Sequence, residues 1–306
     1  MTLSSVLLTL LLVLASPLPT APVSTASDGN DDDDGGAVAS KIYKIGMENA
    51  TGDKPDVFFA RSVDGGETFS DPINLSDNEN WTSHAKIAVA GDHVHVVWID
   101  SEHELGEADE ERGVITVRSS EDGGETFGDP VVLGDPDLPD VGEPFSRHNI
   151  LEIEATTTGN SDESNVYISW VASGGGEGAG RLDFAKSDDS GQSFELQTDL
   201  VRYTDYIEME IATSRNTDSI YIAGQSPSDG DITIPDQIFF LRSTDGGETF
   251  DEPVILQDVN PDVEDTLHFY SMEVDDDRIE ITWLSGGRLL PVTLVAVSTD
   301  GGETWG

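Results

Sequence analysis

Short apolar stretches alternate with polar turns along most of the chain. In the second of five similar units, short β-rich runs lie at residues 86–90 and 94–98, and further runs follow at 114–117 and 130–133. Short β-rich runs at even spacing, with turn residues between them, predict strands rather than helices. Comparable runs recur at 151–155, 166–170, 182–185, 209–212, 220–223, 238–241, 254–256, 270–274, 279–283 and 294–297. Each unit therefore predicts one small antiparallel sheet of four strands.

An octapeptide with the pattern Ser-x-Asp-x-Gly-x-Thr/Ser-aromatic follows the third strand of every unit, and we call it the aspartate turn. Its five copies occupy residues 62–69, 120–127, 187–194, 243–250 and 298–305. Their closing aromatic residues lie 58, 67, 56 and 55 residues apart. A repeat of this period indicates an architecture that uses one structural unit several times.

The residue types of the aspartate turn suit a tight connection between two strands. Aspartate accepts hydrogen bonds from nearby backbone N–H groups, and glycine adopts a positive φ without a steric penalty. The closing aromatic residue is expected to tuck under the turn. We therefore predict structural roles for Asp64, Asp122, Asp189, Asp245 and Asp300. The cations that directly precede a turn serine are predicted to be structural too: Arg61, Lys186 and Arg242.

The octapeptide resembles the Asp-box, the BNR repeat of sialidases and of other β-propellers. The resemblance covers about residues 41–306. It implies an all-β fold, a β-propeller of four-stranded antiparallel blades. It also implies that the turns lie on the face opposite the active sites of those families. The strongest motif in this sequence thus predicts a fold and not a reaction.

The first and last units are each one strand short. Residues 42–45, 57–60 and 73–75 leave the first unit without an innermost strand, and the last unit stops at Gly306 without an outer strand. Either the end blades close into a five-bladed ring by an unusual exchange of strands, or the chain is a fragment of a six- or seven-bladed propeller. We favour the fragment, because folded proteins rarely tolerate open sheet edges.

The chain is strongly acidic. It has 61 Asp and Glu residues against 15 Lys and Arg residues, for a formal net charge of −46. Acidity spread along a whole sequence is typical of proteins from halophiles, because concentrated salt screens the self-repulsion. We predict a salt-adapted, haloarchaeal source. Such a field excludes nucleic acids and anionic membrane surfaces as partners.

The N-terminal segment predicts export. The apolar run 5–15 is too short to span a bilayer comfortably, and small residues after it offer a cleavage site, so residues 1–26 are interpreted as a signal peptide. Residues 27–40 form an acidic linker, and 41–306 form the propeller. No Lys or Arg precedes the run, which leaves an uncleaved membrane anchor as the second interpretation. The expected location is extracellular or at the cell surface.

Candidate ligand residues gather in the connections opposite the aspartate turns. Arginine is the usual clamp for carboxylate and phosphate groups, because its planar fork binds two oxygens. The sequence predicts a ligand face for a glycan or a small anion, formed by Arg147, His148, Arg181, Arg202, Tyr206, His268 and Arg288. No cofactor or metal site is predicted. The alternative is that this face collects polar residues because its loops are longer.

The functional hypothesis is an exported, non-catalytic β-propeller that binds a glycan or a cell-surface protein. The first alternative is a sialidase-like exo-glycoside hydrolase. The resemblance implies that such an enzyme carries three arginines, a Tyr–Glu pair and an Asp. It also implies an Arg-Ile-Pro stretch before the first repeat, and residues 37–60 contain no arginine. The second alternative is a protein-assembly scaffold. Trp98, Trp170 and Trp283 share one place in the repeat, which predicts core positions rather than a sugar platform.

Overall fold

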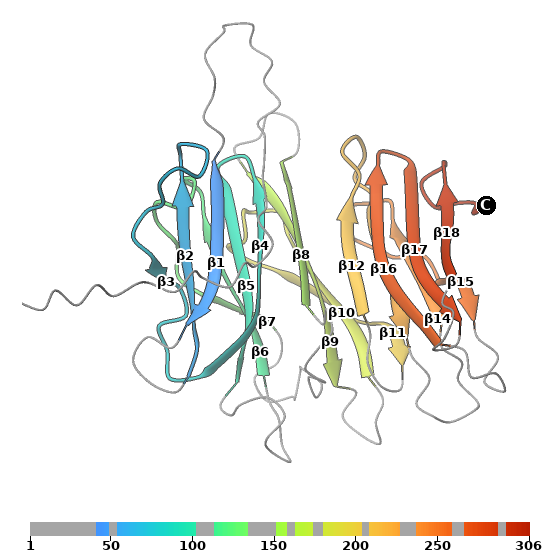
Figure 1. Cartoon of the computed structure of the whole chain (residues 1–306), viewed down its shortest axis with the longest axis horizontal. Helices are drawn as coiled ribbons and strands as arrows, with labels where there is room; N and C mark the ends of the chain where they lie inside the picture. The colour runs from blue at the N-terminus through green and yellow to red at the C-terminus, as the bar shows by residue number, and fades with distance from the viewer. Residues whose placement is uncertain are drawn as a thin grey trace, which may run out of the picture.

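Five antiparallel sheets make up the computed structural model of this protein. The structure describes residues 41–48, 54–101, 113–133, 151–157, 163–173, 180–203, 208–226, 237–258, 266–286 and 292–306. Figure 1 shows the sheets side by side, from β1–β3 at one end to β16–β18 at the other. The predicted signal peptide and acidic linker lie outside the described residues.

The sheets follow the repeat, and we number them as blades 1 to 5 in chain order. Blade 1 contains β1 (Ile42–Glu48), β2 (Asp56–Ser62) and β3 (Ile73–Asn74). Blade 2 contains β4 (Trp81–Ala90), β5 (His93–Ser101), β6 (Gly113–Ser120) and β7 (Val131–Leu133). Blade 3 contains β8 (Leu151–Thr157), β9 (Ser164–Ser173), β10 (Gly180–Ser187) and β11 (Glu195–Tyr203).

The last two blades repeat the same order. Blade 4 contains β12 (Glu208–Thr213), β13 (Ile220–Ser226), β14 (Gln237–Ser243) and β15 (Val254–Asp258). Blade 5 contains β16 (Thr266–Asp275), β17 (Arg278–Gly286) and β18 (Val292–Ser298). The predicted all-β architecture of small antiparallel sheets is confirmed. β11 is longer than the sequence predicts, so Arg202 lies in a strand and not in a connection.

The register identifies which strand each end blade lacks among the described residues. In every blade the strand that ends at a turn serine pairs with the preceding strand in one register: Ile42 faces Ser62, as Val94 faces Ser120 in blade 2. β1 is therefore equivalent to the second strand of a complete blade. In blade 5, Val297 and Gly306 exchange two backbone hydrogen bonds of 3.1 and 3.0 Å just past the last aspartate turn.

The core lies between the blades. The first strands pack against one another, β4 on β8, β8 on β12 and β12 on β16. The second strands of blades 2 to 4 are buried along almost their whole described length, and every residue of β5 is buried. In blade 5, at the end of the row, buried and half-buried positions alternate along β17. Trp98, Trp170 and Trp283 are buried at 1, 1 and 5 % exposure, which confirms their predicted core role.

Each aspartate turn is held by the same four hydrogen bonds. In blade 4, Ser243 Oγ donates to Asp245 Oδ1 (2.8 Å) and accepts from Gly247 N (2.9 Å). Asp245 also accepts from the backbone N (2.9 Å) and the hydroxyl (2.7 Å) of Thr249. These bonds, led by the Thr249 hydroxyl, lower the pKa of Asp245 to about 2. The carboxylate is thus committed to the turn, as predicted, and so are those of Asp64, Asp122, Asp189 and Asp300.

The second glycine of a turn and its closing aromatic residue join one blade to the one before it. Gly247 has φ +82°, and a Cβ there would lie 3.0 Å from the ring of Phe184 in blade 3. Phe250 meets the same ring edge-on, with the centroids 5.0 Å apart. Equivalent edge-on pairs are Phe59–Phe127 at 4.9 Å and Phe240–Trp305 at 4.8 Å. The turn therefore fastens neighbouring blades to each other.

The aspartate turns share a face with the hairpins that join first and second strands. Gly123 N donates to Asp92 O, and Gly246 N donates to Asp218 O, at 2.7 and 2.8 Å. Gly301 N does the same to Asp277 O at 2.8 Å. These bonds define a turn face, on which two pockets of the described residues lie.

Candidate functional site

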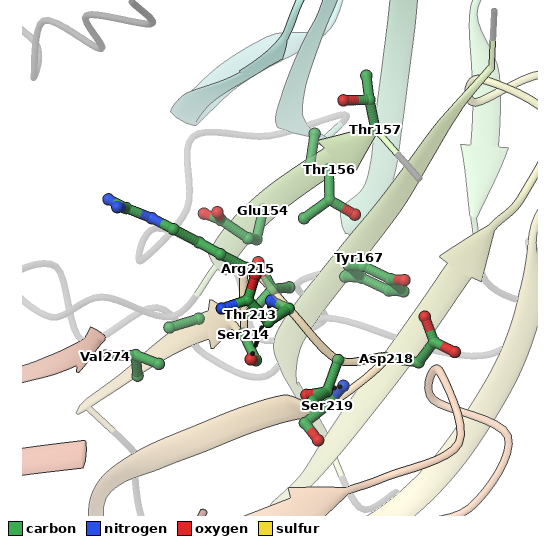
Figure 2. A pocket seen from close by; sticks show the side chains of 14 residues that line it. Glu154, Thr156, Thr157, Tyr167, Thr213, Ser214, Arg215, Asp218, Ser219 and Val274 are labelled. Atoms are coloured by element: carbon green, nitrogen blue, oxygen red, sulfur yellow. Dashed lines mark hydrogen bonds between the residues drawn. The ribbon is translucent and has the colours of Figure 1, made fainter. Parts of the chain in front are cut away.

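A polar pocket of about 550 Å³ opens on the turn face between blades 3 and 4. It lies where β8 and β12 end, beside the β12–β13 hairpin, and Val274 of β16 contributes one apolar side (Figure 2). The volume falls in the range of small-molecule sites. Because three first strands contribute to it, its position depends on how the blades pack.

The pocket lining is rich in hydroxyl and amide groups. The residues that supply them are Thr156, Thr157, Tyr167, Thr213, Ser214, Asn216, Thr217 and Ser219. Ser214 Oγ accepts from Asn216 N at 3.4 Å, and Ser214 N donates to Ser219 O at 3.0 Å, so the β12–β13 hairpin is internally braced. Groups that both donate and accept, on a braced backbone, suit a ligand with many hydroxyls.

Glu154 is the carboxyl group nearest the inner wall of the pocket. It lies on β8 beside Thr213 of β12, and Figure 2 shows the two side chains close together at the pocket. Burial, reinforced by the like charge of Glu152, raises the pKa of Glu154 to about 7, against the hydrogen bond from Thr213. Glu154 can therefore gain or lose a proton near neutral pH.

Two further carboxylates continue inward along the first strands. Glu152 of β8 pairs with Lys86 of β4 at 2.9 Å, and Glu210 of β12 accepts from Met272 N of β16 at 2.7 Å. Burial raises the pKa of both carboxyl groups, and Lys86 counteracts the rise at Glu152. Four adjacent first strands are thus linked by polar contacts. This row ties the blades together beneath the pocket.

Arg215 and Asp218 supply the remaining charge at the pocket rim. Both are exposed on the β12–β13 hairpin. In Figure 2 the Arg215 side chain extends past Glu154, and the Asp218 carboxylate lies on the opposite side of the pocket. Among the residues that line the pocket, two carboxyl groups thus stand against one guanidinium group.

Most of the predicted ligand face cannot be compared with the structure. Arg147, His148, Tyr206 and Arg288 lie outside the described residues, and only the backbone of Arg202 is described, in β11. Arg181 lies on β10, and its Nε donates to the buried Asp183 at 2.9 Å. His268 is exposed on β16. Those predictions remain predictions. The structure pairs the backbones of Arg181 and Arg202 across β10 and β11, whereas His268 lies in another blade.

The pocket itself was missed by sequence reasoning. The run Leu151-Glu-Ile-Glu-Ala155 predicts a strand with one polar side, but not that this side is enclosed by neighbouring first strands. An available signal was the paired glutamates of that strand, repeated as Glu208 and Glu210 in the next blade. No three His, Cys, Asp or Glu side chains of the described residues are placed to hold a metal ion.

Among known proteins, solved structures resemble this chain. No family model matches the chain, and no curated protein matches it. A polysaccharide lyase of a new family, an ulvan lyase, superposes with a TM-score of 0.50 at 15 % identity, covering 85 % of this chain and 62 % of its own. The intramolecular trans-sialidase from Ruminococcus gnavus gives 0.47 at 13 % identity, covering 91 and 80 %. The Trypanosoma rangeli sialidase gives 0.45 at 14 % identity, covering 86 and 45 %.

The likeness to the lyase shows the fold of this chain, a β-propeller, and at such low identity it shows the fold alone. The chain spans less than two thirds of the length of that lyase. Within the described residues, no helix has the length and apolar character needed to cross a membrane.

Proposed function

We propose that this protein is an exported β-propeller that binds a glycan in the pocket between blades 3 and 4. The observation that carries the proposal is the lining: hydroxyl and amide groups from the end of β8, from β9 and from the braced β12–β13 hairpin surround a cavity of about 550 Å³. Sugar hydroxyls need partners that donate and accept, and threonine, serine and asparagine supply both. The solved structures that resemble the chain include proteins that process glycans, which supports this ligand class.

The charged residues at the pocket favour a part of the glycan that carries no carboxylate. Glu154 and Asp218 would repel a carboxylate, and Arg215 alone would attract it. The anionic ligand predicted from the sequence would bind to the arginines predicted for the opposite face instead. Glycan binding is therefore proposed at the turn face, and the anion site stays a separate prediction.

The test is direct binding of neutral and acidic oligosaccharides to the whole chain in concentrated salt, by glycan array and then by titration calorimetry. Thr157→Val and Arg215→Gln alter the pocket, and Thr293→Val removes an exposed hydroxyl on β18 as the matched control. Loss of one hydrogen bond to the ligand is expected to weaken binding about threefold to tenfold for Thr157→Val. Equal affinity of all three variants would overturn the proposal.

The protonation of Glu154 gives a second measurement on the same site. A sugar that covers this side chain removes more water from it, which disfavours the charged form further. Binding then takes up a proton, so affinity is expected to fall as the pH rises from 6 to 8. Glu154→Gln should remove this dependence and keep the affinity found at pH 6. A dependence that survives the substitution would place the ligand elsewhere.

The sialidase-like hydrolase ranks second. It requires arginines that converge on one carboxylate, and the one candidate arginine whose side chain is described, Arg181, is engaged with Asp183. Turnover of a fluorogenic sialoside in concentrated salt separates the two functions. Turnover that disappears in Arg147→Ala and persists in Thr157→Val would replace glycan binding at the turn face by hydrolysis at the opposite face.

A further inference from the structure

The boundary between blades 2 and 3 departs from the other blade boundaries on the turn face. At the first boundary, Arg61 reaches the next aspartate turn, where Nη2 donates to Glu125 Oε1 at 2.7 Å and Nη1 to Gly123 O at 3.3 Å. The same bridge is made at the third boundary by Lys186 and Glu248, and at the fourth by Arg242 with Gly301 O and Glu303. Each cation precedes a turn serine and fills the space beside the following turn.

Neither partner of this bridge is present between blades 2 and 3. Ser119 stands in the position of the cation, and Gln192 in the position of the glutamate. Ser119 Oγ turns inward to His95 Nδ1 at 2.8 Å, and Gln192 Nε2 donates to Glu121 Oε1 at 3.1 Å. Both the cation and its acceptor differ from those at the other boundaries, and the short side chain of Ser119 leaves room.

That room is a groove of about 720 Å³ between the two aspartate turns. The cation of β6 does not fill it, because Arg118 lies one residue earlier and points to the other side of the strand. Its guanidinium donates to Leu75 O of blade 1 at 3.0 Å and to Gly128 O at 2.8 Å. The residues that line the groove include Glu121, Asp122 and Asp129, and no Lys or Arg.

We propose that this groove binds the arginine side chain of a partner polypeptide, which takes the place of the missing internal cation. Arg61 shows the contacts that such a fork makes beside an aspartate turn: one backbone carbonyl and one carboxylate. The groove presents the backbone of Ser190, which is equivalent to Gly123, with the carboxylates of Glu121 and Asp129. A planar guanidinium matches this pair of acceptors better than the point charge of a lysine.

The competing explanation is attraction by the acidic surface as a whole. A protein with a net charge of −46 attracts every cation, so loss of a single carboxylate proves little. The other blade boundaries suggest a control that leaves the net charge unchanged. Ser119→Arg combined with Gln192→Glu rebuilds the bridge found at the other boundaries and leaves the net charge unchanged. This double variant is expected to lack the groove but to keep the electrostatic field of the acidic surface.

The experiment titrates a capped Gly-Arg-Gly peptide, and its lysine counterpart, into the whole chain in concentrated salt, with heat as the readout. The parent is expected to bind the arginine peptide more tightly than the lysine peptide. The double variant should weaken arginine binding about tenfold, as expected for the loss of a charge-assisted fork. Asp129→Asn should weaken it too, whereas Glu252→Gln, at the equivalent place in blade 4, should not.

Two results would overturn the proposal. One is a folded double variant that binds the peptide as tightly as the parent. The other is an equal loss in Asp129→Asn and Glu252→Gln, which identifies general attraction to an acidic surface. If the double variant does not fold, the comparison of Asp129→Asn with Glu252→Gln decides between binding in the groove and general attraction to the acidic surface.

Discussion

Blades 3 and 4 pack against each other through aromatic rings, whereas blades 2 and 3 pack through a buried histidine. Between blades 3 and 4, Tyr167 stacks on Phe184, and Phe250 of the next turn meets Phe184 edge-on. Between blades 2 and 3, His95 and Val117 occupy the places of the tyrosine and the phenylalanine. His95 is fully buried, and its ring nitrogens meet the hydroxyls of Ser119 and Ser164, both at 2.8 Å.

The difference shows how a repeat can keep its shape and change its properties. An aromatic boundary is stabilised by buried area and does not respond to pH. A histidine boundary depends on two hydrogen bonds and on a neutral ring, because an isolated buried charge is costly. The aromatic boundary opens into the polar pocket on the turn face, whereas the histidine boundary leaves a groove between two aspartate turns. Variation of the repeat is thus concentrated where blades meet.

The largest expected effect is on the aromatic boundary. Phe184→Ala removes a fully buried ring that contacts two other rings, and should lower the free energy of unfolding by about 3–5 kcal/mol. Val117→Ala, the equivalent change at the histidine boundary, should cost about 2 kcal/mol, since fewer buried methyl groups are lost. Urea unfolding in constant salt measures both. An equal loss of unfolding free energy in the two variants would mean that the Phe184 ring is not the main stabilising contact of its boundary.

A medium effect is expected from acidification of the histidine boundary. Burial, with a smaller contribution from His93, lowers the pKa of His95 to about 3. The unfolded chain protonates near pH 6.5, so it binds more protons than the folded chain between pH 6.5 and 3. The contribution of His95 to stability is complete above that window and is lost as the pH falls through it. At pH 5 the loss should be about 2 kcal/mol relative to pH 8.

His95→Gln isolates this contribution from the titration of the many carboxyl groups. Glutamine keeps one donor and one acceptor for the two serines but does not titrate. Unfolding of parent and variant is followed from pH 8 to pH 4, and their stability difference should narrow as the pH falls. A constant difference would show that His95 is not neutral in the fold or that water reaches it.

The smallest expected effect concerns the exposed bridges. Arg242→Ser with Glu303→Gln copies the residues of the histidine boundary onto the fourth boundary without a change in net charge. Exposed ion pairs contribute little and are screened by salt, so the loss should be about 0–1 kcal/mol and smaller still in concentrated salt. Thermal unfolding at two salt concentrations measures it. A loss above that of Val117→Ala would make the bridge a main support of the boundary.

The sequence by itself determined the repeat, and through it the fold. Short β-rich runs predicted the strands. Serine, aspartate and glycine at fixed offsets predicted the turns, because these interactions are local and each residue finds its partner within four positions. The structural role of Asp245 could be predicted for the same reason. That of Arg61 was predicted because a cation recurs before the turn serine, although its side chain bonds to Gly123 and Glu125 of the next blade. The absence of a first strand from the described residues of blade 1 could be predicted as well, since the register follows from the turn.

Only the tertiary structure decided what happens between blades. The enclosure of Glu154, the turn of Ser119 toward His95 and the groove beside Gln192 depend on partners about 25 to 75 residues away along the chain. Alternation shows which side of a strand is polar, but burial by a neighbouring sheet sets the pKa and the open space. For this reason the blades could be predicted from the sequence, while the pocket and the groove could not.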